Sequence, residues 1–451
     1  MKKRYAVDMM VVGFALFAIF FGAGNLIFPP ALGVLCGTEW KLGFLFYYIA
    51  DIGLAVAGVL AMIKWDGKAS KLAEPLGRIP AAVMTTAIIL CVGPGLAIPR
   101  TAATTYELGI VPLLGIEGNR GTLAILSVVF FAIVLALTIR PSKVVDIVGK
   151  FLTPVLLAAL TVLIIVGILH PAGQMQAPAT QHVVREGVLN GYQTLDIFGT
   201  AFVSALLLKS IRDKGHTSRS SINLLSRGAA GIAAVLLLLV YGGLAFLGAG
   251  TGSLWKEAYL AGEINQASLL TNITYALLGR SGLAILAVVV ASACLTTAIG
   301  LVSATAEYFE TFLNGKVSYK TVAVITCVVS ACLCNLGLSQ IISISAPVLM
   351  LMYPLTILMV LTAWIRDYVP EKLPYRLSGA VTLAVSIMEV LGGTFGIASM
   401  ARLDALLPFS ELGFSWLVPA VVSFLAGIVL VRINGSERKV SNEAAGKPKA
   451  A

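Results

Sequence analysis

Residues 20–30 read Phe20-Phe21-Gly22-Ala23-Gly24-Asn25-Leu26-Ile27-Phe28-Pro29-Pro30, in the middle of the first long apolar run of the chain. Two glycines and an asparagine favour an unwound stretch at membrane depth, with an inner half-helix ending near Phe21 and an outer one beginning near Gly24. Freed backbone groups need partners, since each orphan in hydrocarbon costs several kcal/mol. Carbonyls of the inner half suit a cation, and N–H groups of the outer half suit a carboxylate. The competing interpretation is close helix packing through small residues.

The composition around this stretch sets the class of protein. The chain has 451 residues, of which 58% are hydrophobic and 12% charged. Soluble proteins carry about 25% charged residues, so a soluble globular protein is excluded. Apolar runs of about 20 residues recur from end to end without the alternation of outer-membrane barrel strands. The sequence therefore predicts an all-α polytopic membrane protein.

The apolar runs predict about twelve membrane spans. Their approximate limits are 6–35, 41–63, 80–106, 121–140, 144–169, 187–210, 222–249, 281–309, 319–338, 340–365, 376–392 and 413–432. The longest polar-rich connections, 170–186 and 250–280, are too short for a soluble domain. The first run is also too long for a signal-peptide core of about 7–15 residues.

Basic residues orient these spans. Of the 32 lysines and arginines, 25 fall on the segments that share a side with the N-terminus, 6 fall on the opposite side, and Arg100 lies within a span. Cytoplasmic loops carry the excess of basic residues, so both termini are expected in the cytoplasm. The formal net charge of +10 is explained by this pattern, and no nucleic-acid partner is expected.

The first and sixth spans are both interrupted by small and polar residues. Their offset of five is odd, so the two spans run in opposite directions across the bilayer. This arrangement predicts a five-plus-five inverted repeat with a binding site where the broken helices meet. The predicted parts are a first repeat of helices 1–5 (1–170), a second repeat of helices 6–10 (187–365), helices 11–12 (374–432) and a disordered cytoplasmic tail (433–451).

The interrupted sixth span contains an acid. Asp196 lies in an apolar setting, where an ionisable group is expensive and indicates a functional site by default. Its carboxylate suits a substrate ammonium or helps a cation indirectly. The alternative is a structural hydrogen bond between helices. The candidate substrate-binding residues of the two breaks are Gly22, Ala23, Gly24, Asn25, Tyr192, Gln193, Thr194 and Asp196.

Other polar residues inside spans leave alternatives open. Thr296 and Thr297 of the eighth span offer two hydroxyl oxygens to a monovalent cation, although threonine in a helix more often bonds its own i−4 carbonyl. Arg100 either reaches the outer interface, pairs with an acid, contacts a carboxylate or forms a gate. Asp51 and Glu389 are lone acids for which structural pairing is the simpler interpretation.

Cysteines, histidines and catalytic motifs indicate neither a metal centre nor an enzyme. The six cysteines form no CxxC pair, and the three histidines lack metal-ligand spacing. No HExxH, GxSxG or paired-aspartate motif appears, so an intramembrane enzyme is disfavoured, and no resident cofactor is expected. A channel would need a pore-lining filter, and none is evident.

The first-span motif, together with Gly-Tyr-x-Thr-Leu-Asp in the sixth span, resembles the branched-chain amino acid:cation symporters over essentially the whole chain. That family is related to the five-plus-five superfamily of the bacterial leucine transporter, whose first-helix Gly-x-Gly-Asn and eighth-helix Ala-x-x-Thr-Ser are similar to residues 22–25 and 293–297. The resemblance implies one sodium held by carbonyls of Ala18, Phe21 and Ala293 and by hydroxyls of Thr296 and Thr297. It implies a second sodium at Phe20, Asn25 and Thr194. The seventh span lacks the mid-membrane asparagine of the relative.

The function implied by this resemblance is secondary symport of leucine, isoleucine and valine, driven by sodium through alternating access. The residues alone indicate only a small zwitterion. The alternative is a proton-coupled transporter of another small neutral amino acid. The expected location is the bacterial inner membrane, with lipid around the spans and no obligate protein partner.

Overall fold

The computed structural model describes residues 2–139 and 153–444, and every regular element in these two ranges is helical. An all-α fold is thus confirmed for the described part of the chain. The beginning of the predicted fifth span and the end of the predicted tail lie outside the described residues. The α-helices of unit 1, defined below, are α1 (Lys2–Phe20), α2 (Ala23–Cys36), α3 (Trp40–Tyr48), α4 (Leu54–Ile63), α7 (Ala97–Thr104), α8 (Val111–Leu114), α9 (Arg120–Ile139), α11 (Thr153–Leu169), α12 (Val183–Tyr192), α13 (Thr200–Asp213), α14 (Arg219–Gly250), α15 (Gly252–Leu260), α16 (Gln266–Phe312) and α17 (Tyr319–Cys334).

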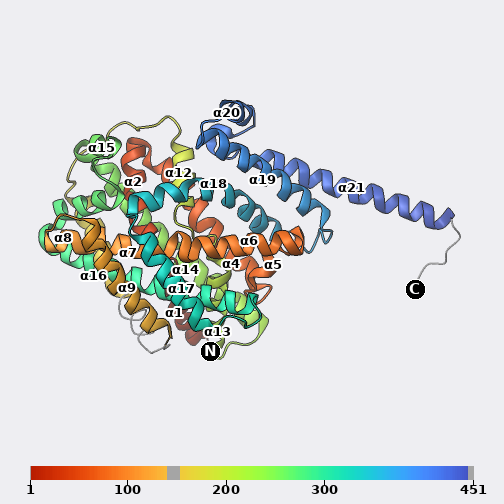
Figure 1. The fold of residues 1–451 in the computed structure, drawn as a ribbon, viewed down its shortest axis with the longest axis horizontal. Coiled ribbons are helices and arrows are strands. Elements are labelled where there is room, and N and C mark those ends of the chain that lie inside the picture. Colours follow the sequence, from red (N-terminus) through yellow and green to blue (C-terminus); the bar gives the residue numbers. More distant parts are fainter. Residues whose placement is uncertain (1, 140–152, 445–451) are drawn as a thin grey trace. The chain divides into compact units, whose positions relative to one another are not determined.

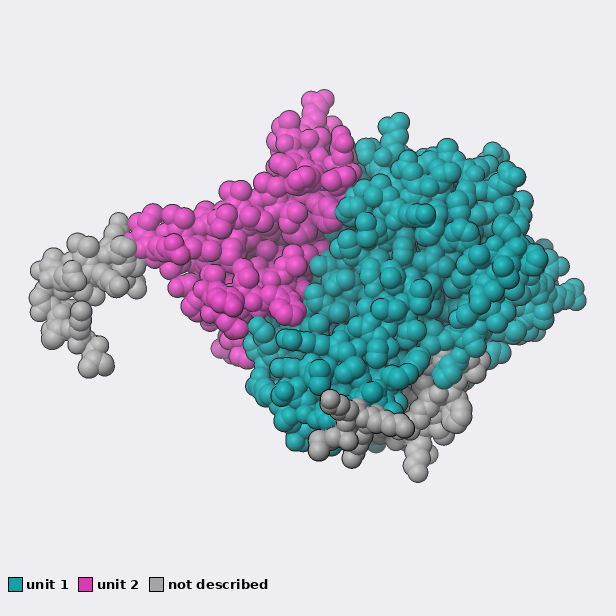
Figure 2. Space-filling view, turned by 180° about the vertical axis from the view of Figure 1, so that it is seen from behind, with its two compact units in different colours: residues 1–68, 86–349 teal, residues 69–85, 350–451 magenta. Residues whose placement is uncertain are grey.

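The chain divides into two compact units, residues 1–68 with 86–349 and residues 69–85 with 350–451 (Figure 2). We call them unit 1 and unit 2. Helices α6 (Arg78–Leu90) and α18 (Leu338–Ala363) each contribute residues to both units. The remaining helices of unit 2 are α5 (Ala69–Ala73), α19 (Leu373–Gly393), α20 (Ala398–Ala405) and α21 (Leu417–Ala444).

Within the described residues, seven helices are long and apolar enough to cross a membrane, and four shorter apolar helices accompany them. One of the seven, Ala23–Ile63, joins the outer half of the predicted first span to the predicted second span, because the connecting turn is itself helical. The helices that are long enough to cross a membrane therefore do not correspond one to one with the twelve predicted spans. The number of twelve stays a prediction.

The broken first and sixth spans run antiparallel within unit 1. Helix α1 packs against α13, the second half of the sixth span, and α2 packs against α12, its first half. Figure 1 shows α2 and α12 at one end of the unit and α1 and α13 at the other. This agrees with the opposite directions predicted from their odd offset. The inverted repeat as a whole stays a prediction.

Helix α14 packs along both halves of the first span, by two kinds of contact. A Cβ on Gly33 would overlap the carbonyl oxygen of Ala245, and a Cβ on Gly248 would overlap that of Pro30, so α2 and α14 touch backbone to backbone. Helix α1 approaches α14 less closely: a Cβ on Gly13 would lie 2.8 Å from Ile232 Cβ and 3.3 Å from the Ala229 carbonyl oxygen, and a Cβ on Gly228 would meet the Met9 side chain. The outer half of the span is thus held more rigidly than the inner half.

Two predicted irregular segments are largely helical. The connection 250–280 contains α15 and the start of α16, which is interrupted at Gly279 (φ 63°, ψ −153°), close to the predicted start of the eighth span. Helix α21 extends to Ala444, beyond the predicted end of the twelfth span, and the disorder of the tail stays a prediction. Charged residues such as Glu437, Arg438 and Lys439 have good helix propensity and continue the preceding turns.

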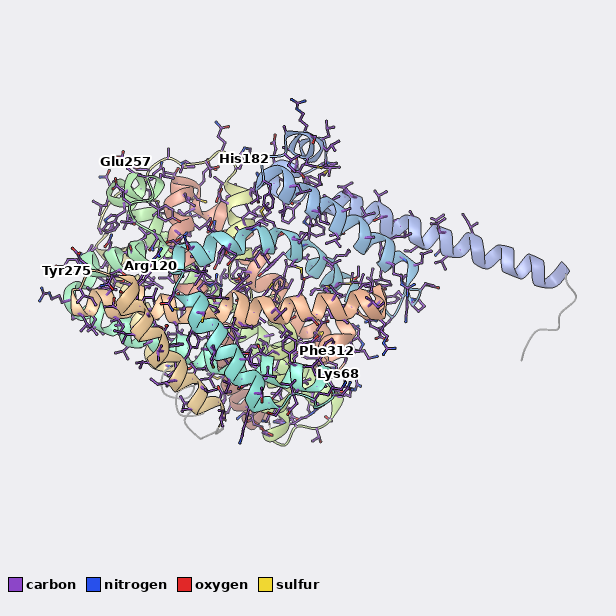
Figure 3. All side chains as sticks on the ribbon, viewed as in Figure 1. Lys68, Arg120, His182, Glu257, Tyr275 and Phe312 are labelled. Atoms are coloured by element: carbon purple, nitrogen blue, oxygen red, sulfur yellow. The ribbon has the colours of Figure 1, made fainter. Side chains whose placement is uncertain are left out.

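Four residues next to predicted connections of unit 1 lie on the sides that the predicted topology requires. Figure 3 shows His182 and Glu257, from the two connections predicted to be external, on the upper side of the unit. Lys68 and Phe312, which border connections predicted to be cytoplasmic, lie together on the lower side. The alternation of sides along the chain therefore agrees with the predicted order of the spans.

We expect single cysteines to report which end faces the cytoplasm. Cys332 is the one exposed cysteine of the six, so a Cys332→Ala chain is the background. In it, a membrane-impermeant maleimide should modify Ala261→Cys in intact cells and Thr217→Cys only after permeabilisation, since both positions are exposed and basic residues favour the cytoplasmic side. Labelling of Thr217→Cys in intact cells would contradict the orientation.

Candidate functional site

The first span breaks at Phe21 and Gly22, within one or two residues of the predicted limits. Helix α1 ends at Phe20, and α2 begins at Ala23 after Gly22 in an extended conformation (φ −121°, ψ −171°). The N–H of Phe21 still bonds the Phe17 carbonyl at 2.9 Å, so the helix stops directly after it. Both sides of the break are buried, which places the unsatisfied ends of two half-helices inside the protein.

The sixth span breaks over residues 193–199, between α12 and α13. Short i→i+3 turns replace helical bonds there, as between the N–H of Phe198 and the Leu195 carbonyl at 3.1 Å. Leu195 has φ 69°, an unfavourable backbone conformation for a branched side chain. Strain of this kind persists only where the surroundings enforce it, and it clusters at functional sites. The unwound segment is therefore built into the fold.

A hydrogen bond joins the two breaks. Asn25 Nδ2, in the first turn of α2, donates to Asp196 Oδ2 at 2.8 Å and to the Tyr241 hydroxyl at 2.5 Å. Asn25 is buried, whereas Asp196 keeps partial accessibility deep within the helices. The carboxylate is thus held on one side and left open on another, as a ligand-binding group should be.

The second span contributes a second acid to this cluster. Asp51 lies on the π-helical turn η2 (Ile49–Gly53), is 1% exposed, and accepts a hydrogen bond from Thr194 Oγ1 at 2.8 Å. Thr194 precedes Asp196 by two residues, so both acids border the break of the sixth span. Folding brings Asp51 to the break of the sixth span, and its hydrogen bond from Thr194 agrees with the structural pairing expected of this acid. Its position in an apolar run was the available signal.

Arg100 lies beside the same break of the first span. It is on α7, only 2% exposed, with its guanidinium carbon 5.5 Å from the centre of the Phe28 ring. Its charge acts on Asp196. A Cβ on Gly24 would lie 3.2 Å from its Nη2 atom, so the guanidinium packs against the first turn of α2. Of the alternatives left open, extension to the outer interface is wrong.

The eighth span reaches the break of the first span, as the resemblance implied. A Cβ on Gly22 would lie 3.7 Å from Thr297 Oγ1. Thr296 Oγ1 instead donates to the Ser292 carbonyl of its own helix at 2.9 Å, the common behaviour of a helical threonine. Ala18 lies on α1, two residues before its end, and Ala293 lies on α16.

The predicted substrate residues thus fall on two adjoining breaks. Gly22 lies in the first break, and Ala23, Gly24 and Asn25 follow it in the first turn of α2. Tyr192 ends α12, and Gln193, Thr194 and Asp196 lie in the second break. Tyr241 was missed, because one tyrosine in a long apolar run carries no local signal. It stands in the seventh span and contacts Asn25.

Comparisons with known proteins agree with this geometry. A sequence profile described as "Branched-chain amino acid transport protein" matches residues 5–434. The branched-chain amino acid permease BrnQ of Bacillus subtilis (strain 168) is 33% identical over 438 residues, or 95% of this chain and 98% of that protein. The branched-chain amino acid transport system 2 carrier protein of Pseudomonas aeruginosa is 35% identical over 437 residues, with 96% and 98% covered.

Two solved structures share the fold. Mhp1, a nucleobase-cation-symport-1 family transporter in a closed conformation with bromovinylhydantoin bound, superposes with a TM-score of 0.61 at 14% identity, covering 94% of this chain and 93% of that one. MhsT in complex with L-phenylalanine gives a TM-score of 0.55 at 16% identity, with 92% and 98% covered. These identities are too low to carry ligand contacts, so the similarity is one of fold.

Proposed function

Because the chain belongs to the family of branched-chain amino acid transport proteins, we propose that it imports leucine, isoleucine and valine with sodium as a secondary active symporter. It is an integral membrane transporter, not an enzyme. The observation that carries the proposal is the bond of Asn25 to Asp196, which joins two helix breaks inside the bundle. We place the protein in the bacterial inner membrane with both termini in the cytoplasm.

The two breaks offer complementary groups to an amino acid. Asp196 is partly accessible and suits the substrate ammonium, while the first N–H groups of α2 suit the carboxylate. The proposed cycle is alternating access, in which α1 and α13 border the cytoplasmic side of the site and α2 and α12 the external side. One sodium moving with a zwitterion gains about 2.3 kcal/mol per 100 mV, enough for roughly 40-fold accumulation.

We place the coupling sodium at the carbonyls of Ala18, Phe21 and Ala293 and the hydroxyls of Thr296 and Thr297. The approach of Thr297 to Gly22 supports this site, since it brings the eighth span to the end of α1. A second sodium at Phe20, Asn25 and Thr194 would lie beside the carboxyl groups of Asp51 and Asp196, whose negative charge favours a cation.

A specific observation favours the proton as the alternative coupling ion. Asp51 is 1% exposed and accepts a hydrogen bond from Thr194, two residues before Asp196, so two acids lie at one helix break, and acids inside a membrane protein commonly carry protons. Uptake of labelled leucine into proteoliposomes separates these alternatives, with sodium, lithium and proton gradients imposed one at a time. We expect accumulation with sodium. Accumulation with a proton gradient alone would replace sodium by the proton, and no leucine uptake under any gradient would overturn the substrate.

Thr297→Ala should raise the sodium concentration for half-maximal leucine uptake at least tenfold, about 1.4 kcal/mol. The Thr297 oxygen faces the break, whereas Thr296 already bonds its own helix, so Thr296→Ala should have a smaller effect. Thr297→Ser keeps the oxygen and is the matched control. Unchanged sodium dependence in Thr297→Ala, at equal protein levels, would remove Thr297 from the site.

A further inference from the structure

We propose that Arg100 recognises the carboxylate of the transported amino acid, opposite the recognition of its ammonium by Asp196. The inference rests on the proposed amino-acid substrate and deepens it, since the first N–H groups of α2 then share the carboxylate with a full positive charge. Recognition of both charges selects zwitterions over amines and over fatty acids of the same shape.

The burial of Arg100 is the first step. The residue is 2% exposed on α7, in a span otherwise made of apolar and small residues. A guanidinium inside a membrane protein is costly, faces the interior and indicates a pathway or binding site. Lysine or glutamine would satisfy a need for packing alone. The planar fork of arginine is the side chain that matches a carboxylate with two parallel hydrogen bonds.

The placement of the guanidinium is the second step. Nη2 lies against Gly24, in the first turn of α2, where backbone N–H groups lack helical partners. The ring of Phe28, one turn later, lies 5.5 Å from the guanidinium carbon and holds its plane by a cation–π contact. The guanidinium therefore lies beside the first turn of α2, and both the fork and this end of the helix attract negative charge.

The disposition of opposite charges is the third step. Gly24 lies against Arg100, and the next residue, Asn25, donates a hydrogen bond to Asp196. The first turn of α2 therefore lies between a cationic and an anionic group. The other polar or titratable groups near this pair are Asp51, Tyr241 and Cys294. Arg100 and Asp196 attract each other, and a zwitterion placed between them satisfies both.

Gly24 is explained by the same arrangement. A Cβ at this position would lie 3.2 Å from both Arg100 Nη2 and Phe28 Cε2, closer than either ordinarily tolerates. A side chain would therefore displace the guanidinium from the helix end. Glycine at position 24 serves the approach of Arg100 as well as the break itself.

The test measures selectivity, so that a loss of folding is not mistaken for a loss of recognition. Purified protein in detergent with saturating sodium is titrated with leucine and with leucinamide, which keeps the ammonium and side chain but lacks the carboxylate. In Arg100→Gln, the preference for leucine over leucinamide should fall about a hundredfold, because a buried charge pair is lost. Arg100→Lys should retain part of it. The control Arg120→Gln, exposed at the start of α9 (Figure 3), should retain all of it.

Gly24→Ala provides a second variant that keeps every charge. It should lower the same preference about tenfold by moving the guanidinium. An unchanged preference in either Arg100→Gln or Gly24→Ala would overturn the proposal. If Arg100 only neutralised Asp196, Arg100→Gln would weaken the binding of leucine and of leucinamide equally, and the preference for leucine would not change. Failure of the wild-type chain to bind leucine would instead overturn the proposed substrate.

Discussion

Asp196→Asn should lower leucine uptake about 30-fold or more below the wild-type rate at equal protein levels, while the protein still inserts and folds. Asparagine keeps the volume, and its carbonyl oxygen still accepts the hydrogen bond that Asn25 Nδ2 donates at 2.8 Å. The negative charge that attracts an ammonium is lost. Losing a partner of a buried charge pair typically costs 2–5 kcal/mol, about 30-fold or more.

The measurement is initial leucine uptake in proteoliposomes, with a monodisperse gel-filtration peak as evidence of folding. Asp213→Asn is the matched control, since Asp213 ends α13 and is exposed. Wild-type uptake kinetics in Asp196→Asn would mean that the acid is structural. Binding of leucine without transport would instead assign Asp196 to coupling.

Gly248→Ala should prevent stable folding or lower the unfolding temperature by many degrees. The added methyl group would overlap the carbonyl oxygen of Pro30, a backbone atom that cannot rotate away. Overpacking in a tight core typically costs 1–3 kcal/mol, and more when backbone must move. Thermal unfolding of the purified protein, followed by gel filtration, measures the effect.

Gly231→Ala is the matched control for this substitution. Gly231 lies on the same helix α14, and a Cβ there meets nothing within 4 Å. Alanine has the better helix propensity, so this variant should be as stable as the wild-type chain or slightly more stable. Equal stability of Gly248→Ala and Gly231→Ala would contradict the backbone contact between α2 and α14.

Local patterns in the sequence predicted the helix breaks because each break depends on residues that follow one another in the chain. Gly22 and Gly24 mark the first, and Asp196 within an apolar run marks the second. The antiparallel course of the first and sixth spans followed from the number of spans between them, because their offset of five is odd. The limits of the first break were predicted to within one residue, whereas α16 begins 15 residues before the predicted start of the eighth span.

Contacts between distant residues could not be predicted in the same way. Asp51 meets Thr194 across a separation of 143 residues, and Asn25 meets Tyr241 across 216. The residues around Asp51 and Tyr241 do not identify their partners. The partner of Asp51 and the contact of Tyr241 with Asn25 could therefore not be predicted. Arg100 had several open interpretations for the same reason, because only folding places it against Gly24.

Helix α14 contacts the two halves of the first span differently, so α2 is fixed to α14 and α1 is free to move. Backbone contact through Gly33 and Gly248 leaves no side chain that can rotate to let α2 slide, so α2 and α14 must travel together. Helix α1 also meets α14 through the long side chain of Met9, which lies against Gly228 and can change rotamer. In the proposed cycle, the site therefore opens toward the cytoplasm when α1 rotates about Phe21 and Gly22. Helix α2, the external half of the span, stays in place against α14.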